Sequence, residues 1–127
     1  MKNQIAIYLR LSLEDVDKRT NAVKDDSNSI ASQRLLINRH LDQTPMLCNL
    51  PRIEFCDDGF SGTNFDRPDF QRMIECAKRG EISCIVVKDL SRFGRDYLEV
   101  GDYLEHIFPF LGIRFKTRAI CLYGGGT

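Results

Sequence analysis

The sequence predicts an α/β domain of three layers, in which helices flank both faces of a mostly parallel sheet of about four or five strands. Short apolar runs that suit buried parallel strands alternate with amphipathic segments of helical periodicity, in the order βαβαβαβ. The chain has 127 residues, 43% of them hydrophobic, which is enough to bury the core of one domain. No internal repeat or linker divides it.

The first predicted strand, residues 5–12, is the stretch on which the functional hypothesis depends. It is apolar on both faces except near its end, where Arg10 and Ser12 stand. Because residues two apart on a strand point to the same side, we expect both side chains to leave the carboxyl end of the strand together. Ligands bind at that edge in open α/β sheets. An arginine beside a serine at this edge is therefore the starting hypothesis.

The next segments predict a long loop and the first helix. Residues 13–28 are polar and charged without apolar periodicity, which indicates a loop. Residues 29–42 follow as a helix with apolar side chains at helical spacing, and residues 27–29 supply its candidate N-caps. Gln33 falls in the first turns of this helix, so we expect it near the carboxyl edge of the sheet.

The middle of the chain predicts a second strand and a second helix. Residues 52–58 alternate polar and apolar side chains, as a strand does, and end in Asp57 and Asp58. Pro68 suits the first turn of a helix, and Gly80 suits its end. The expected apolar face of this helix consists of Phe70, Met73, Ile74 and Ala77.

Two further strands and a helix complete the predicted order. Residues 83–87 form the clearest strand and are followed by Lys88. Asp96 is a candidate cap for the last helix, which Pro109 should end or bend because proline lacks the backbone N–H. Residues 113–116 read as the fourth strand.

The predicted strands end in functional groups, and parallel pairing brings such ends to one edge. The loops beyond the strands add hydroxyl groups and cations. The candidate edge residues are Arg10, Ser12, Asp57, Asp58, Ser61, Arg67, Lys88, Asp89, Ser91, Arg92 and Arg95. Several arginines around a serine suit phosphoryl transfer, because guanidinium groups pair two-pronged with phosphate oxygens and stabilise transition-state charge without a metal.

Other chemistries fit the sequence less well. His40 and His106 fall on predicted helices, and there is no GxSxG elbow or P-loop motif, which argues against a serine hydrolase or a P-loop NTPase. The five cysteines form no CxxC pair, so we expect free thiols in the reducing cytoplasm and no metal site. Eighteen basic residues balance eighteen acidic ones, so any anion site must be local. The apolar runs are too short to cross a membrane, and no membrane partner is expected.

Four motifs, in this order, resemble those of the serine recombinases, the resolvase and invertase family that includes the large transposon and phage integrases. The motifs are Tyr8-Leu9-Arg10-Leu11-Ser12, then Ser29-Ile30 with Gln33, then Asp58-Gly59-Phe60-Ser61-Gly62 with Arg67-Pro68, and then Lys88-Asp89-Leu90-Ser91-Arg92-Phe93-Gly94-Arg95. The resemblance spans roughly residues 5–115. It implies a resolvase-like fold and a catalytic domain over residues 1–115.

The resemblance implies site-specific DNA recombination. Ser12 would attack a DNA phosphodiester and form a 5′-phosphoserine intermediate, from which strands are exchanged and religated. No cofactor or metal is implied, and family members act on a DNA crossover site as dimers and tetramers. The implied site comprises the catalytic residues Ser12, Arg10, Arg67, Arg92, Arg95 and Asp58 and the supporting phosphate- or DNA-binding residues Gln33, Ser61 and Lys88. Arg67 and Asp58 are both candidates for moving the serine proton.

Three features depart from the small resolvases. Ser91 stands where they have an aspartate, and the loop of residues 13–28 is longer than theirs. Both features favour the large serine recombinase branch. Residues 116–127 do not resemble the family's continuation, so we expect an atypical or truncated tail. Residues 122–127 carry no packing signal. We expect the isolated fragment to be inactive without a DNA-binding region.

Two alternative functions remain open at this point. A receiver-like phosphoacceptor domain shares the βα order, and Asp57, Asp58 and Lys88 would form its acidic pocket with a bound Mg²⁺ ion. A non-catalytic recombinase remnant would act only in the association of subunits.

Overall fold

A computed structural model of the chain describes residues 4–11, 19–20, 29–58, 67–88, 101–117 and 121–123. The predicted loop 13–28 therefore lies largely outside the described residues, and the predicted cap Asp96 lies outside them too. Within the described ranges, no helix is both long enough and apolar enough to cross a membrane.

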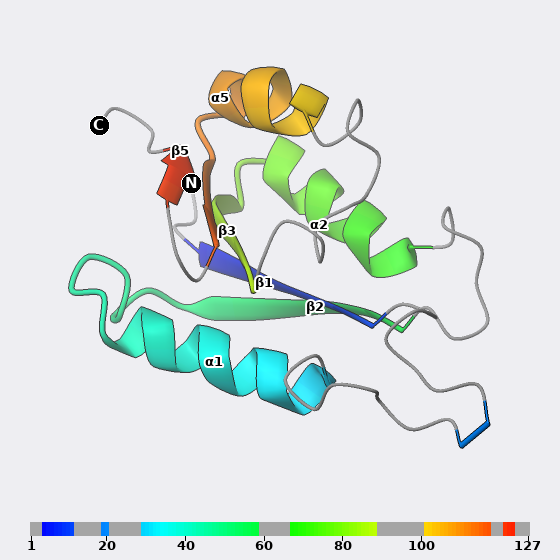
Figure 1. The fold of residues 1–127 in the computed structure, drawn as a ribbon. Coiled ribbons are helices and arrows are strands. Elements are labelled where there is room, and N and C mark those ends of the chain that lie inside the picture. Colours follow the sequence, from blue (N-terminus) through cyan, green and yellow to red (C-terminus); the bar gives the residue numbers. More distant parts are fainter. Residues whose placement is uncertain are drawn as a thin grey trace.

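The described residues form one sheet of five strands in the order β2-β1-β3-β4-β5 (Figure 1). The strands are β1 (Gln4–Leu11), β2 (Arg52–Asp58), β3 (Ile82–Val87), β4 (Arg114–Thr117) and β5 (Cys121–Tyr123). Strands β1 to β4 pair in parallel, whereas β5 runs antiparallel to β4. The predicted α/β class with a mostly parallel sheet is confirmed.

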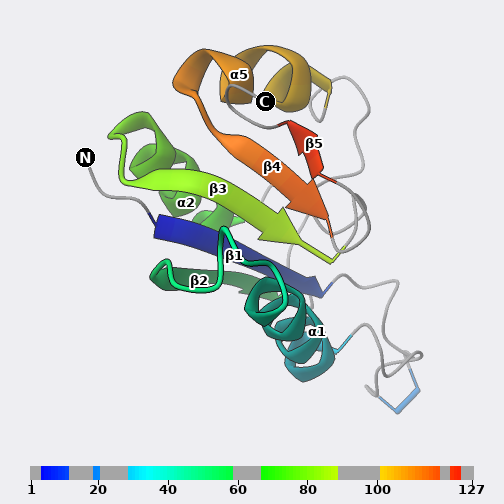
Figure 2. The ribbon, with the colours of Figure 1, turned by 90° about the vertical axis from the view of Figure 1, so that its left-hand side faces the viewer.

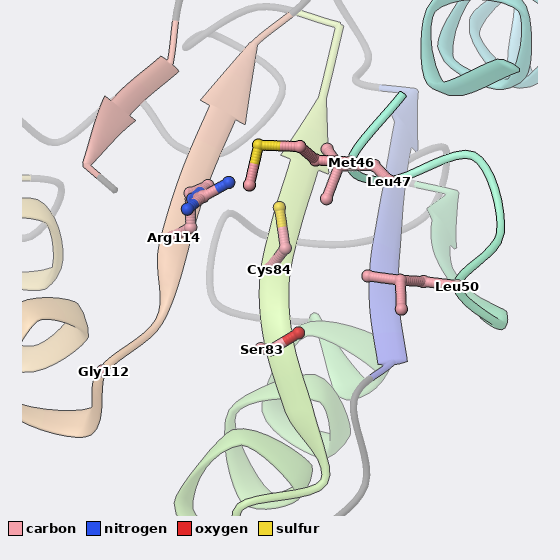
Figure 3. Close-up of a pocket in the computed structure, with 7 residues that line it drawn as sticks. All are labelled: Met46, Leu47, Leu50, Ser83, Cys84, Gly112 and Arg114. Carbon is pink, nitrogen blue, oxygen red and sulfur yellow. The ribbon is translucent and has the colours of Figure 1, made fainter. Parts of the chain in front are cut away.

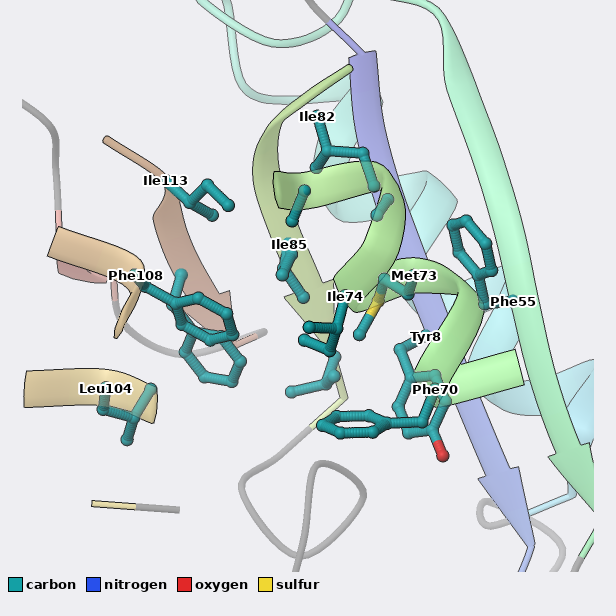
Figure 4. Packing of buried hydrophobic residues seen from close by; sticks show 14 residues of the cluster. Tyr8, Phe55, Phe70, Met73, Ile74, Ile82, Ile85, Leu104, Phe108 and Ile113 are labelled. Atoms are coloured by element: carbon teal, nitrogen blue, oxygen red, sulfur yellow. The ribbon is translucent and has the colours of Figure 1, made fainter. Parts of the chain in front are cut away.

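Helices lie on both faces of the sheet, which gives the three expected layers (Figure 2). Helix α1 (Ile30–Asp42) covers one face, and α2 (Pro68–Lys78) covers the other together with the π-helix η3 (Tyr103–Ile107) and helix α5 (Phe108–Leu111). Alternation along β1 divides the core between these layers. Ile5, Ile7 and Leu9 pack with the α1 side, whereas Ala6 and Tyr8 pack with the α2 side. Figure 4 shows Tyr8 within the cluster on the α2 side.

Local sequence signals explain the ends of both long helices. Ser29 caps α1, because its side-chain oxygen accepts a hydrogen bond of 3.1 Å from the backbone N–H of Ser32. Pro68 begins α2, and Gly80 follows its end with a φ of 77°, which glycine adopts without strain. The predicted apolar face of α2 is buried at all four positions. Sequence periodicity therefore identified this helix and its inward face correctly.

The last part of the chain differs from the prediction in two places. Pro109, which was expected to end or bend the helix, does not end it. The helix continues through it to Leu111, and the irregularity precedes the proline, where the backbone N–H of Phe108 bonds to the carbonyl of Tyr103 in a wider π turn. The tail was expected to lack packing, yet Cys121–Tyr123 pairs with β4 as strand β5. Three residues are too few to show a periodicity that predicts a strand.

Candidate active site

The carboxyl ends of β1, β2 and β3 meet at one edge of the sheet, as parallel pairing requires. Arg10 on β1 lies opposite Asp57 on β2 in the register, and Lys88 directly follows β3 with a partly buried side chain. The described part of the chain therefore brings together three of the groups that the sequence assigned to this edge.

Arg10 is held through its backbone by Gln33 of α1. The backbone N–H of Arg10 donates to Oε1 of Gln33 at 3.4 Å, and the carbonyl of Arg10 accepts from Nε2 at 2.9 Å. Strand β1 pairs with β3 as far as Ile7 and Val86. The Gln33 amide hydrogen-bonds to β1 at Arg10, beyond the last of these pairs. Gln33 is fully buried. It therefore fixes the end of β1, and Arg10 keeps only 9% of its surface exposed.

Asp57 caps helix α2 from the neighbouring strand. Its carboxylate accepts backbone N–H groups from Asp69 and Phe70, both at 3.0 Å, in the first turn of the helix. The hydroxyl group of Tyr8 also donates to it, at 2.7 Å. Arg67, at the N-cap position, makes no capping hydrogen bond of its own with its side chain. Asp57 is only 4% exposed, so this carboxylate joins β1, β2 and α2 inside the protein.

Arg67 lies against the same group of residues. Its Nε donates to the hydroxyl oxygen of Tyr8 at 3.2 Å, and its guanidinium carbon lies 4.1 Å from the ring centre of Phe70. Tyr8 and Phe70 contact each other edge-on, with ring centres 5.6 Å apart (Figure 4). Burial raises the pKa of the Tyr8 phenol, an effect that the Arg67 charge opposes and Asp57 reinforces. The phenol therefore stays neutral and donates its proton to Asp57.

Arg10 and Arg67 approach the edge from the same side of the sheet. Arg10 is two residues beyond Tyr8 on β1, so alternation places it on the face that α2 covers. Two cationic side chains are thus held on one face beside the end of β1. Such a pair can bind the oxygens of a phosphate group.

The remaining predicted site residues are described in part or not at all. Asp58 is the last residue of β2, but its side chain is not described. Ser12, the proposed nucleophile, directly follows β1 and lies outside the described residues. The others outside the described residues are Ser61, Arg92 and Arg95.

The sequence reasoning missed the supporting roles of Tyr8, Asp57 and Phe70. The sequence predicts Asp57 as a functional strand end or as part of a receiver-like pocket. Its buried carboxylate instead accepts three hydrogen bonds, and this does not favour a phosphoacceptor role. The sequence contains one indication of the role of Tyr8. This residue lies two positions before Arg10 and hence on the same face of the strand.

Histidine and metal chemistry have no support in the described part of the chain. His40 lies in α1, and His106 is an exposed residue of η3 whose Nδ1 lies 3.3 Å from Asp102. No group of three or more histidine, cysteine or acidic side chains that could hold a metal occurs among the described residues. Four cysteines in these ranges are free thiols, as predicted.

A separate cavity of about 240 Å³ lies on the α1 side of β3 and β4 (Figure 3). Its lining includes Met46 and Leu47 of the connector after α1, together with Cys84 and Arg114. Ser83 and Gly112 also line it, which places it near the amino ends of β3 and β4. The cavity is therefore distinct from the carboxyl edge where Arg10 and Arg67 lie.

Comparisons with known proteins agree with the fold. A family model described as "Resolvase, N terminal domain" matches residues 5–119. The N-terminal catalytic domain of TP901-1 integrase has 21% identity and a TM-score of 0.69, with 91% of this chain and 77% of that chain covered. The C-terminal catalytic domain of ISC1926 TnpA, an IS607-like serine recombinase, has 17% identity and a TM-score of 0.63, with 90% and 68% covered. A search of curated protein sequences gave no match. At these identities, the structural likeness establishes a shared fold.

Proposed function

We propose, from the premise that this chain belongs to the resolvase family of serine recombinases, that its carboxyl edge cleaves and rejoins DNA phosphodiesters. The observation that supports this most directly is the pair of arginines beside the end of β1. Arg10 is almost buried and held by Gln33, and Arg67 is held by Tyr8 and Phe70. Ser12 is the residue after β1, so the sequence puts a nucleophile next to this pair.

In the proposed reaction, Oγ of Ser12 attacks the phosphorus of a DNA backbone. A bond forms between Oγ and phosphorus, and the bond from phosphorus to the 3′ oxygen breaks. The serine gives up its proton, and the 3′ oxygen leaves as a hydroxyl group. The 5′ phosphate stays on Ser12 as a diester, so the reverse attack by a 3′-hydroxyl rejoins the strands without an external energy source. Arg67 and Asp58 remain the candidates for moving the serine proton.

The arginines supply the electrostatic stabilisation in this proposal. Arg10, Arg67, Arg92 and Arg95 bind the oxygens of the scissile phosphate, on which negative charge develops in the transition state. Ser61, Lys88 and Asp58 position the phosphate or organise the arginines. Gln33 acts through the backbone of Arg10, which is supported by its two hydrogen bonds to that residue. Arginine stays protonated throughout the cycle, so the proposal requires neither cofactor nor catalytic metal.

The proposed partner is a DNA crossover site, on which subunits associate as dimers and tetramers for strand exchange. Residues 1–115 form the catalytic domain in this proposal, and residues 116–127 form an atypical or truncated tail. The charge balance of the chain is zero, which gives little general attraction to DNA. We therefore expect activity only when a DNA-binding region is supplied, in the cytoplasm and without a membrane partner.

The proposal is tested by trapping the covalent intermediate. The chain is fused to a sequence-specific DNA-binding domain and mixed with nicked duplexes that carry two of that domain's sites around a randomised core. We expect a protein–DNA adduct that survives denaturing electrophoresis, that Ser12→Ala abolishes and that Arg10→Ala slows by about a hundredfold or more. Arg39→Ala, at an exposed position of α1, is the matched control. An adduct that persists in Ser12→Ala would overturn the assignment of the nucleophile. A folded fusion that forms no adduct would favour the non-catalytic alternative.

A further inference from the structure

We infer that Asp57, Tyr8 and Phe70 together orient the guanidinium of Arg67 and are positioning residues for the proposed strand cleavage. We call these three residues the Arg67 anchor. The inference rests on the proposed function, which places Arg67 at the scissile phosphate. It adds residues to which neither the sequence reasoning nor the family resemblance gave this task.

Asp57 is the fixed point of the anchor. Its two carboxylate oxygens accept hydrogen bonds of 2.7 Å from Tyr8 and 3.0 Å from each of two backbone N–H groups of α2. Donors from β1 and α2 therefore converge on a side chain of β2, which is 4% exposed. A carboxylate that is buried and held from three directions has little freedom to move.

Tyr8 connects the carboxylate of Asp57 to the guanidinium of Arg67. A phenol has one proton, and a carboxylate only accepts, so the Tyr8 proton points to Asp57. The hydroxyl oxygen then presents a lone pair to Nε of Arg67, at 3.2 Å. This arrangement also fixes the polarity of the chain of hydrogen bonds, which runs from Arg67 through Tyr8 to Asp57.

Phe70 supplies the second constraint on Arg67. The guanidinium carbon lies 4.1 Å from the centre of the Phe70 ring and 5.5 Å from that of Tyr8. The backbone N–H of Phe70 is itself bonded to Asp57. The two residues that contact Arg67, Tyr8 and Phe70, are therefore both hydrogen-bonded to the carboxylate of Asp57. Together they limit the position and the tilt of the Arg67 guanidinium.

Capping of α2 alone would not require the Tyr8 hydroxyl. Asp57 already accepts two N–H groups from the first turn of that helix. Removing the hydroxyl while keeping the ring separates the two roles, because Tyr8→Phe preserves the contact with Phe70 and the cap on α2. It removes only the connection between Asp57 and Arg67.

A double-mutant cycle in the fusion protein tests this inference. We expect Tyr8→Phe to slow single-turnover adduct formation by about ten- to a hundredfold, since small misplacement of a positioning group costs rates of that order. In an Arg67→Ala background, the same change is expected to cost less than about twofold, because the two residues act as one unit. DNA affinity should be unchanged. Arg39→Ala, at an exposed position of α1, is the control and should leave the rate unchanged.

A second readout reports on Arg67 without DNA. In ¹⁵N spectra of the chain, the Nε–H of Arg67 should exchange slowly with water, and Tyr8→Phe should accelerate that exchange at least about tenfold, since it removes the acceptor. A purely structural role of Tyr8 would lower the melting temperature and leave this exchange unchanged.

The outcomes separate the anchor from the proposed function. If Ser12→Ala still forms the adduct, or if Arg67→Ala reacts at the wild-type rate, the proposed function fails in its nucleophile or in its use of Arg67. If Arg67→Ala is slow while Tyr8→Phe reacts at the wild-type rate, or if their effects multiply, only the anchor is wrong. Unchanged exchange of the Arg67 Nε–H in Tyr8→Phe would also overturn it.

Discussion

The two arginines described at the carboxyl edge are held in opposite ways. Arg10 is fixed through its main chain, because the buried Gln33 amide bonds both its N–H and its carbonyl. Arg67 is fixed through its side chain, by the Tyr8 hydroxyl and the Phe70 ring. One support comes from α1 and the other from β1, β2 and α2, so the two lie on opposite faces of the sheet.

The difference follows from where each arginine stands in the fold. Arg10 belongs to a strand, whose pleat determines the side to which its side chain points, and Gln33 holds the backbone of that strand. Arg67 stands at the N-terminus of a helix, where no ladder of hydrogen bonds orients it, and its side chain needs contacts of its own. Variants that remove each support should therefore fail in different ways.

The largest effect is expected from Asp57→Ala, which leaves two N–H groups of α2 and the Tyr8 hydroxyl without their buried acceptor. We expect the free energy of unfolding to fall by about 3–5 kcal/mol. Urea denaturation of the isolated chain measures this loss. Asp42→Ala is the control, since Asp42 is an exposed residue whose ion pair with Arg52 is worth less than about 1 kcal/mol. Equal losses in the two variants would show that Asp57 does not join these elements.

The two hydrogen bonds from Gln33 to the backbone of Arg10 form what we call the Arg10 clamp. Its removal is expected to lower the free energy of unfolding somewhat less. Gln33→Leu leaves a backbone N–H and a carbonyl of Arg10 unpaired, and the free energy of unfolding should fall by about 2–3 kcal/mol.

Gln33→Glu keeps an acceptor for the N–H of Arg10 but loses the donor and buries a charge. The free energy of unfolding of Gln33→Glu should be lower than that of the wild type at neutral pH. This difference should shrink as the pH falls towards 4, because a protonated carboxyl group can donate to the Arg10 carbonyl. The exposed Gln43→Leu is the control, and a pH-independent deficit would contradict the clamp.

A smaller and pH-dependent effect is expected from Tyr8→Phe, which should lower the free energy of unfolding by about 1 kcal/mol at neutral pH. Burial raises the pKa of Tyr8 in the folded state, so above a pH of about 10 the unfolded chain ionises this phenol while the folded chain does not. Stability is then lost as the pH rises, by about 1.4 kcal/mol per pH unit for this one group. Unfolding measured at successive alkaline pH values should show this slope in the wild type and a shallower one in Tyr8→Phe. Identical slopes would mean that Tyr8 ionises as readily in the folded state.

The smallest effect on the free energy of unfolding is expected for a residue that contacts neither Arg10 nor Arg67. Arg34 and Glu54 form an ion pair of 3.0 Å across α1 and β2, but their side chains are 46% and 38% exposed. Solvent screens such a pair, so Arg34→Ala should change the free energy of unfolding by less than about 1 kcal/mol and leave adduct formation unchanged. A loss as large as that of Gln33→Leu would show that surface ion pairs, rather than the two supports, hold this part of the sheet.

The sequence was sufficient for the order of the elements up to β4 and for the inward face of α2. Both depend on local periodicity, which Phe70, Met73, Ile74 and Ala77 display clearly. It was also sufficient to bring Arg10 to the same edge as Asp57, because parallel strands require it. Strand β5 could not be predicted, since three residues show no period and their pairing with β4 is set by the tertiary fold.

The partners of the site residues could not be read from the sequence either. Tyr8 bonds Asp57 across 49 positions of the chain, and Gln33 bonds Arg10 across 23. Such contacts depend on the strand register and on where α1 crosses the sheet, which composition and spacing do not encode. Gln33 even occupies a position of the apolar stripe of α1, where a buried glutamine indicates only that some polar partner must exist.

The identity of the residue that carries DNA in the trapped adduct decides whether this domain cleaves DNA as proposed. The fusion protein is digested after reaction, and tandem mass spectrometry locates the nucleotide on the peptide. We expect a nucleotide 5′-phosphate on Ser12, the residue that follows β1 and the buried Arg10. Attachment to any other residue, Asp57 or another serine included, would contradict it.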